Sequence, residues 1–165
     1  METCRIIKIS NDLGAIQKVI DEINKSLETR CDSEDIQAIS MSLYEVITNA
    51  IEHGNLAIDW ETKNKALQGG TLDDLMEERM QKEPFASRNV TIEYKIDNEK
   101  ATFIIGDDGD GFNWRDIPDP TKEENVTAPH GRGLFIIRSL MDDISFDGNG
   151  NKITLVKYFT GDSNH

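Results

Sequence analysis

Three short stretches of this sequence carry side chains that could do chemistry on a phosphate group. The first holds an acid and an amide four residues apart, Glu45 and Asn49, within a helix predicted over 32–54. Counting about 100° per residue from Ile36, both side chains fall on the side away from the apolar stripe. A carboxylate and an amide oxygen one turn apart can hold a magnesium ion while the carboxylate faces a nucleophile. An exposed polar face is the alternative interpretation.

The second stretch follows the strand predicted over 101–107, where Asp107, Gly109 and Gly111 form an Asp-x-Gly-x-Gly pattern. This pattern places a carboxylate at the end of a strand, and its glycines let another group approach the backbone closely. An EF-hand calcium loop is excluded, because its first and last positions would be a glycine and an isoleucine instead of acids. A plain tight turn remains the alternative.

The third stretch is a glycine-rich run at the entry to a helix predicted over 133–141. It consists of His130, Gly131, Arg132, Gly133 and Leu134. Glycines at a helix N-terminus expose backbone N–H groups at the positive end of the helix dipole, which suits phosphate. A dinucleotide fingerprint is excluded because its third glycine position holds Ile136, and a Walker A loop because no Gly-Lys-Ser/Thr occurs. A simple hinge between loop and helix is the alternative.

The elements that position these stretches follow from hydrophobic periodicity and turn signals. Strands are predicted at 3–9, 90–96, 101–107, 144–146 and 152–159. Helices are predicted at 13–29, 32–54 and 133–141. The order of these elements predicts an α+β two-layer sandwich, in which helices cover one face of a mostly antiparallel sheet. A long loop over 108–130 is of a length that is usually functional.

A helical insertion is predicted over about 56–88, where charge is dense and apolar residues are sparse. Thr71 and Asp74 are spaced as a variant of the capping box, which marks a helix start inside this segment. The segment is too short to bury a core of its own, so we expect a single domain over 1–165.

Composition limits the partners and the compartment. The 165 residues include 18 basic and 31 acidic side chains, for a net charge of −13. This charge disfavours direct nucleic-acid binding and attachment to anionic membranes. The two cysteines, Cys4 and Cys31, exclude a disulfide scaffold and a zinc ribbon. No signal peptide or apolar stretch of roughly 18 residues is present, so we expect a cytoplasmic protein.

The order of the three stretches resembles the Bergerat-fold (GHKL, HATPase_c) ATPases, whose ATP domains include those of gyrase, MutL and histidine kinases. The run Glu45-x-x-x-Asn49-Ala50-Ile51-x-His53-Gly54-Asn55 is more specifically similar to the N-box of bacterial anti-sigma-factor serine kinases of the partner-switching type. The runs at 131–134 and 140–142 are similar to the same group. The resemblance covers roughly 10–159, and the 56–88 segment is its main departure.

The resemblance implies roles for individual residues. Asn49 would coordinate a magnesium ion that bridges the ATP phosphates, and Glu45 would act as general base on the attacking hydroxyl. Asp107 would accept a hydrogen bond from the adenine amino group, and residues 113–130 would form the lid over ATP. His53 would have a minor role at the edge of the site, although a helix-ending histidine is more often a cap. The implied nucleotide-binding residues are Asn49, His53, Asp107, Gly109, Gly111, Phe112, His130, Gly131, Arg132, Gly133 and Leu134.

The implied activity is that of an ATP-dependent serine/threonine kinase that phosphorylates a small STAS-domain antagonist. The same protein would sequester a sigma factor or a similar regulator, and a homodimer is compatible with the resemblance. A non-catalytic ATP-binding interaction module is the first alternative, favoured by the departure at 56–88. The ATP domain of a split histidine kinase is the second alternative.

Overall fold

The computed structural model describes residues 2–111, 132–147 and 149–159, and these contain one five-stranded sheet. The strands are β1 (Thr3–Ile9), β2 (Val90–Ile96), β3 (Lys100–Asp107), β4 (Asp143–Phe146) and β5 (Lys152–Tyr158). Their order across the sheet is β1-β2-β3-β5-β4, and every neighbouring pair is antiparallel. The five predicted strands are therefore confirmed, with boundaries shifted by one residue at most.

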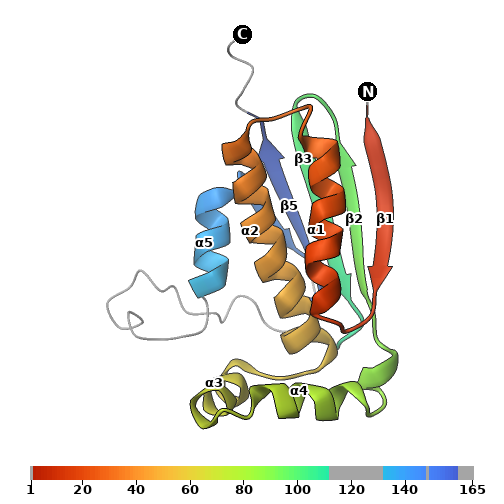
Figure 1. Ribbon diagram of the computed structural model, residues 1–165, viewed down its shortest axis with the longest axis vertical. Coiled ribbons are helices and arrows are strands. Elements are labelled where there is room, and N and C mark those ends of the chain that lie inside the picture. The colour runs from red at the N-terminus through yellow and green to blue at the C-terminus, as the bar shows by residue number, and fades with distance from the viewer. Residues whose placement is uncertain (1, 112–131, 148, 160–165) are drawn as a thin grey trace.

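Three helices cover one face of this sheet, namely α1 (Gly14–Leu27), α2 (Ser33–Asn49) and α5 (Arg132–Leu140) (Figure 1). The 56–88 segment holds α3 (Trp60–Gly69), α4 (Leu72–Met80) and a short 3₁₀ turn, η2 (Phe85–Ser87). Both α3 and α4 lie across one end of the two layers, beyond the C-terminal end of α2 (Figure 1). This arrangement confirms the predicted α+β sandwich with helices on one face of an antiparallel sheet.

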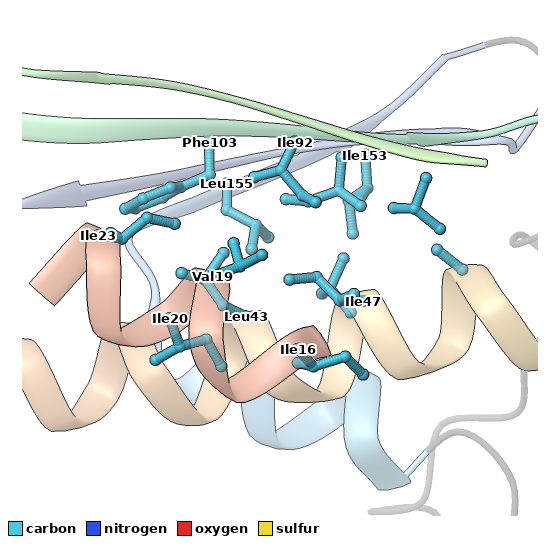
Figure 2. Close-up of a cluster of buried hydrophobic side chains, with 14 of the residues drawn as sticks. Ile16, Val19, Ile20, Ile23, Leu43, Ile47, Ile92, Phe103, Ile153 and Leu155 are labelled. Atoms are coloured by element: carbon cyan, nitrogen blue, oxygen red, sulfur yellow. The ribbon is translucent and has the colours of Figure 1, made fainter. Parts of the chain in front are cut away.

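The core fills the space between the sheet and the helices (Figure 2). Alternate residues of the strands point toward the helices because side chains of a strand alternate between its two faces. The register pairs Phe103 with Leu155 and Ile105 with Ile153, so all four lie on the covered face. Facing them are apolar residues at helical spacing from α1 and α2, namely Ile16, Val19, Ile20, Ile23, Leu43 and Ile47.

The helix predicted over 32–54 begins and extends nearly as expected, but its last turn is wider than an α-helix. Asp32 caps its start by accepting a hydrogen bond from the backbone N–H of Asp35 at 2.9 Å. From Ala50 to Asn55 the chain forms a π-helical turn, η1, and the Leu56 N–H donates to the Ile51 carbonyl at 2.9 Å. Such turns shift the phase of the helix, so α-helical periodicity fails to place the residues within them.

The capping box predicted at Thr71 is wrong. Thr71 precedes α4, but its side chain makes no cap hydrogen bond and its φ and ψ are −115° and 10°. The cause is the end of α3, where Gly70 adopts a φ of 72° and the Thr71 N–H donates to the Ala66 carbonyl. This closing motif fixes the Thr71 backbone outside the extended conformation that an N-cap residue needs.

The 56–88 segment is attached to the core along its apolar residues. Met76 of α4 is buried, and Leu72, Leu75, Met80 and Phe85 pack against the core while remaining partly exposed. None of the helices in the described part of the chain is long and apolar enough to cross a membrane.

Candidate functional site

One end of the candidate site is a close contact between the turn after α2 and the end of β3. The Asp107 carboxylate lies against Gly54, where a Cβ atom would overlap both of its oxygens. The Gly54 carbonyl in turn lies against Gly109, where a Cβ atom would overlap that carbonyl. Only glycine fits at either position without movement of backbone or carboxylate. The Asp-x-Gly-x-Gly stretch and the end of the N-box-like stretch therefore meet, although 53 positions separate Gly54 from Asp107.

Asp107 is held in one orientation with one carboxylate oxygen engaged. Its Oδ1 accepts a hydrogen bond from the Gly109 N–H at 2.8 Å. Burial raises the pKa of this carboxyl from 3.8 to about 6, while the Gly109 hydrogen bond opposes that shift and the neighbouring Asp108 adds to it. A half-buried carboxylate with a raised pKa is typical of a functional group that meets a ligand. A ligand N–H donor would favour its charged form.

Two asparagines hold the loop that carries Asp107. Asn55 is fully buried, and its Oδ1 accepts a hydrogen bond from the Asp108 N–H at 2.7 Å. Its Nδ2 donates to the side chain of Asn11 at 2.8 Å. From the other side, Asn151 Nδ2 donates to the carbonyls of Asp107 at 3.3 Å and Gly109 at 3.4 Å. The sequence stretch around Asn49 includes Asn55, but nothing in its residue type distinguishes it from a solvent-exposed asparagine.

Position 111 requires glycine for a separate reason, the conformation of its backbone. Its φ is +86°, a conformation that side chains with a Cβ rarely adopt. A Cβ atom there would also overlap the Asn149 carbonyl, in the turn between β4 and β5. The second glycine of the Asp-x-Gly-x-Gly pattern therefore lets this turn and the loop after β3 lie in contact.

The other end of the site joins α2 to the first turn of α5. The Glu45 side chain is half-buried and lies against Gly133, where a Cβ atom would overlap the carboxyl group. The backbone N–H groups of a helix's first turn have no partner within the helix and carry the positive end of its dipole. The first and third stretches are thus brought together, with the acid of one against a glycine of the other. Asn49, also half-buried, ends α2 one turn after Glu45.

The arrangement thus places one carboxylate on α2 and another, from the end of β3, against the turn that follows α2. Asp107 is positioned by the turn that follows α2 and has its hydrogen-bonded neighbours in a loop. Glu45 is one helical turn before Asn49 and faces the N-terminal end of α5. A ligand that spans both ends would meet an acceptor for an N–H donor at one end. At the other end it would meet backbone N–H donors, which suit phosphate groups, beside the Glu45 carboxylate.

His53 faces the 56–88 segment. Its Nδ1 is hydrogen-bonded to the Ile58 carbonyl, so Nδ1 carries the proton, and its ring stacks on Trp60 with centroids 4.0 Å apart. Burial lowers the pKa of this imidazole to about 4, with Lys63 acting in the same direction and the Ile58 hydrogen bond opposing. The ring is therefore neutral at pH 7. None of its described contacts joins Glu45 or Asp107, and its expected place in the nucleotide site stays a prediction.

Several predicted residues lie outside what the structure describes. Phe112, His130, Gly131 and the expected lid over 113–130 fall in the undescribed part of the chain. Arg132 and Leu134 belong to the first turn of α5. Among the described residues no group of three or more His, Cys, Asp or Glu side chains could hold a metal ion. A metal here would depend on Asn49 and on ligand oxygens.

Comparison with known proteins supports the resemblance. Residues 79–157 match the family described as Histidine kinase-like ATPase domain, a range that includes Asp107 and Gly133 but starts after α2. The chain is also similar to Serine-protein kinase RsbW from Staphylococcus aureus strains bovine RF122 / ET3-1 and MRSA252. In each case 26% of 132 aligned residues are identical, covering 76% of this chain and 67% of the relative. The predicted resemblance to anti-sigma-factor serine kinases with a histidine kinase-like ATPase fold is confirmed.

Proposed function

This chain is similar to serine-protein kinases with a histidine kinase-like ATPase fold, and we propose that it is an ATP-dependent serine/threonine protein kinase. The observation that carries the proposal is the contact between Glu45 and Gly133. It places a carboxylate beside the first turn of a helix, where unpaired N–H groups favour phosphate. A general base must lie within hydrogen-bond reach of the hydroxyl that attacks the phosphoryl group, and a carboxylate next to the phosphate-binding turn meets this need.

The end of the site formed by Asp107, Gly54 and Gly109, which we propose as its adenine end, suits ATP as the nucleotide. Asp107 Oδ1 is occupied by the Gly109 N–H, which leaves Oδ2 on the side of Gly54. An ionised carboxylate accepts hydrogen bonds and suits the amino group of adenine. The corresponding edge of guanine presents a carbonyl oxygen, which would face the same carboxylate without a proton between them. We therefore expect ATP to be preferred over GTP.

The proposed reaction assigns the proton transfer to Glu45. As the oxygen of a substrate serine or threonine forms its bond to the γ-phosphorus, the Glu45 carboxylate takes the hydroxyl proton. The bond between the γ-phosphorus and the bridging oxygen breaks, and ADP leaves with that oxygen. Backbone N–H groups of the first turn of α5, at Gly133, would stabilise negative charge on the phosphoryl oxygens.

Magnesium fits this site through Asn49. In nucleotide sites Mg²⁺ is bound by one or two protein side chains together with phosphate oxygens and water, so a cluster of acids is not required. Asn49 supplies an amide oxygen one turn from Glu45, on the same side of α2. When bound, the metal neutralises charge on the phosphates.

The proposed substrate is a small STAS-domain antagonist phosphorylated on serine or threonine, and a sigma factor or similar regulator is the second partner. These partners rest on the resemblance to anti-sigma-factor kinases, as does a homodimer. A net charge of −13 favours partners with a complementary basic surface over nucleic acid.

A phosphotransfer assay with Glu45→Ala tests the proposed role. We expect the variant to bind ATP as the wild type does and to lose about 10²–10⁴-fold in transfer to a STAS-domain antagonist. Glu34→Ala is the matched control, because Glu34 is exposed in the first turn of the same helix. Unchanged transfer by Glu45→Ala would remove Glu45 from the role of base. Wild-type protein that binds ATP but transfers no phosphate would favour the alternative of a non-catalytic ATP-binding module.

A further inference from the structure

Three cationic side chains of the 56–88 segment, those of Lys63, Arg79 and Arg88, make polar contacts with the π-helical turn η1 and the residues just after it. This turn carries Gly54, against which the Asp107 carboxylate lies. We propose that Lys63, Arg79 and Arg88 of this segment are positioning residues that hold the turn and thereby hold the adenine end of the site. The inference rests on the proposed function, because it names the element that shapes the nucleotide site proposed there.

Arginine side chains fix the backbone on the C-terminal side of Gly54. Arg79 Nη1 donates to the carbonyls of Leu56 at 2.6 Å and Ala57 at 3.2 Å. Arg88 Nη1 donates to the Asn55 carbonyl at 2.9 Å. The guanidinium groups of both arginines also lie over the Phe85 ring, at 5.3 Å and 5.2 Å from its centroid. The three consecutive carbonyls after Gly54 thus accept charge-assisted hydrogen bonds from Arg79 and Arg88.

The conformation held by these bonds is one the chain does not adopt readily. Ala57 has a φ of +54°, and it is the one non-glycine residue with positive φ in the described part of the chain. A residue with a Cβ is held in this left-handed region only where its surroundings determine it. Two groups hold Ala57 here: the Arg79 guanidinium, which is bonded to the Leu56 and Ala57 carbonyls, and the Ile58 N–H, which donates to the Glu52 carbonyl at 2.9 Å.

An ion pair fixes the turn on the N-terminal side of Gly54. Lys63 Nζ of α3 pairs with Glu52 Oε1 at 2.5 Å, and the Glu52 side chain is only 5% exposed. A buried carboxylate is strongly destabilising once its cation is removed. The residue after Glu52, His53, stacks on Trp60 of α3, the helix that also carries Lys63. The 56–88 segment therefore contacts residues immediately before and after Gly54, which leaves little freedom for Gly54 itself.

A chain of hydrogen bonds continues from this turn to the loop that follows β3 and begins at Asp108. The Asn55 carbonyl accepts from Arg88, while the Asn55 side chain accepts from the Asp108 N–H at 2.7 Å. The Asn89 N–H, one residue after Arg88, donates to Asp108 Oδ2 at 2.7 Å. Displacing the turn would therefore move both Gly54, against which the Asp107 carboxylate lies, and the backbone of Asp108, next to Asp107. Glu45 and Gly133 form the proposed phosphate end of the site. Neither has a described contact with the three cationic side chains of the 56–88 segment.

This difference between the two ends gives the test, which compares two probes of the site. ADP engages the adenine and phosphate ends, whereas inorganic tripolyphosphate engages only the phosphate end. For Arg79→Gln we expect the ADP affinity to fall about tenfold and the tripolyphosphate affinity to stay within about twofold of wild type. Arg79→Lys, which keeps a cationic donor, should recover part of the ADP affinity.

Matched controls are available in the same segment. Lys65 and Lys82 each form an exposed ion pair within their own helix or its end, with Glu61 and Glu78. Lys65→Gln and Lys82→Gln should leave both affinities unchanged. If Arg79→Gln does not fold, the double variant Glu52→Gln with Lys63→Gln removes the buried ion pair without leaving a charge, and the same selective loss of ADP affinity is expected.

The outcomes separate this inference from the proposed function. If the wild type binds ADP and the variants lose affinity for ADP and for tripolyphosphate equally, the inference is overturned and the segment has a purely structural role. Unchanged ADP affinity in folded variants would also overturn it and leave the kinase proposal intact. Wild type that binds neither probe would overturn the nucleotide site and this inference together.

Discussion

The carboxylate of Asp107 lies against the α-carbon of Gly54, so closely that a methyl group at position 54 would overlap it. This contact joins the end of β3 to the turn after α2, and it is continued by the Gly54 carbonyl against Gly109. The proposed adenine end of the site is therefore built by two glycines and one acid from separate parts of the chain.

Gly54→Ala should damage nucleotide binding more than it damages the fold. The added methyl must displace the Asp107 carboxylate or the turn, and overpacking of this kind costs about 1–3 kcal/mol of stability. We expect the folded variant to lose at least about tenfold in ATP affinity, measured by titration calorimetry.

Gly69→Ala is the control for this substitution, because a Cβ atom there meets nothing closer than Thr71 Oγ1 at 3.9 Å. It should keep wild-type ATP affinity. Wild-type affinity in Gly54→Ala would show that the contact with Asp107 does not shape the site.

The pKa of Asp107 predicts a pH dependence. Burial raises this pKa from 3.8 to about 6, so the folded protein holds the proton more tightly than the unfolded chain. The contribution of Asp107 to stability without ligand therefore falls as pH rises from about 4 to about 6. ATP binding has the opposite trend, because the adenine amino group needs the ionised carboxylate. We expect ATP affinity to drop about tenfold from pH 7 to pH 5.

Asp107→Asn separates this effect from titration of ATP itself. The amide cannot ionise, so the variant should show only the pH dependence that the nucleotide brings. At pH 7 it should be more stable than wild type without ligand, since a partly buried charge is removed, yet bind ATP more weakly. A pH dependence of ATP binding identical to that of wild type would show that Asp107 does not contact the base.

Gly133→Ala should impair phosphotransfer without affecting adenine recognition. A Cβ atom at this position would overlap the Glu45 side chain, whose flexible end can move aside at little cost to stability. Alanine also favours the first turn of α5 by up to about 1 kcal/mol relative to glycine. We expect a stable variant with normal ADP affinity and transfer reduced about 10-fold or more, measured with the same STAS-domain antagonist.

A paired measurement checks the cause. In a Glu45→Ala background the added methyl has no carboxyl group to displace, so Gly133→Ala should cause no further loss. Independent losses from the two substitutions would contradict a direct effect of Gly133 on Glu45.

Much of the fold and part of the site follow from sequence pattern. Alternating apolar residues predicted the strands, and helical periodicity predicted the helices that cover them, because burial on one face imposes those periods. The three stretches that could do chemistry were found by their glycines and acids. Glu45 with Gly133, and Gly54 with Asp107, are brought together in the structure. Their roles in nucleotide binding stay predictions until they are tested.

The rest depends on geometry that local pattern does not encode. On an α-helical wheel Glu52 falls on the polar side of its helix. The π-helical turn instead buries it against Lys63. Arg79 and Arg88 sit in a charged segment that is typical of a solvated surface, yet both bind backbone carbonyls. Asparagine is common in exposed turns, so its residue type did not mark Asn55. In the structure Asn55 is fully buried, and its side chain hydrogen-bonds with Asn11 and with the Asp108 N–H.

The most direct test of the nucleotide site is thermal unfolding with ATP, ADP and GTP, each with and without magnesium, on wild type and Asn49→Ala. A ligand at 100 times its dissociation constant adds about 2.7 kcal/mol to stability, which shifts the unfolding temperature visibly. The account predicts magnesium-dependent stabilisation by ATP but not by GTP, and a smaller effect in Asn49→Ala. No shift at millimolar ATP, or equal shifts with GTP, would contradict it.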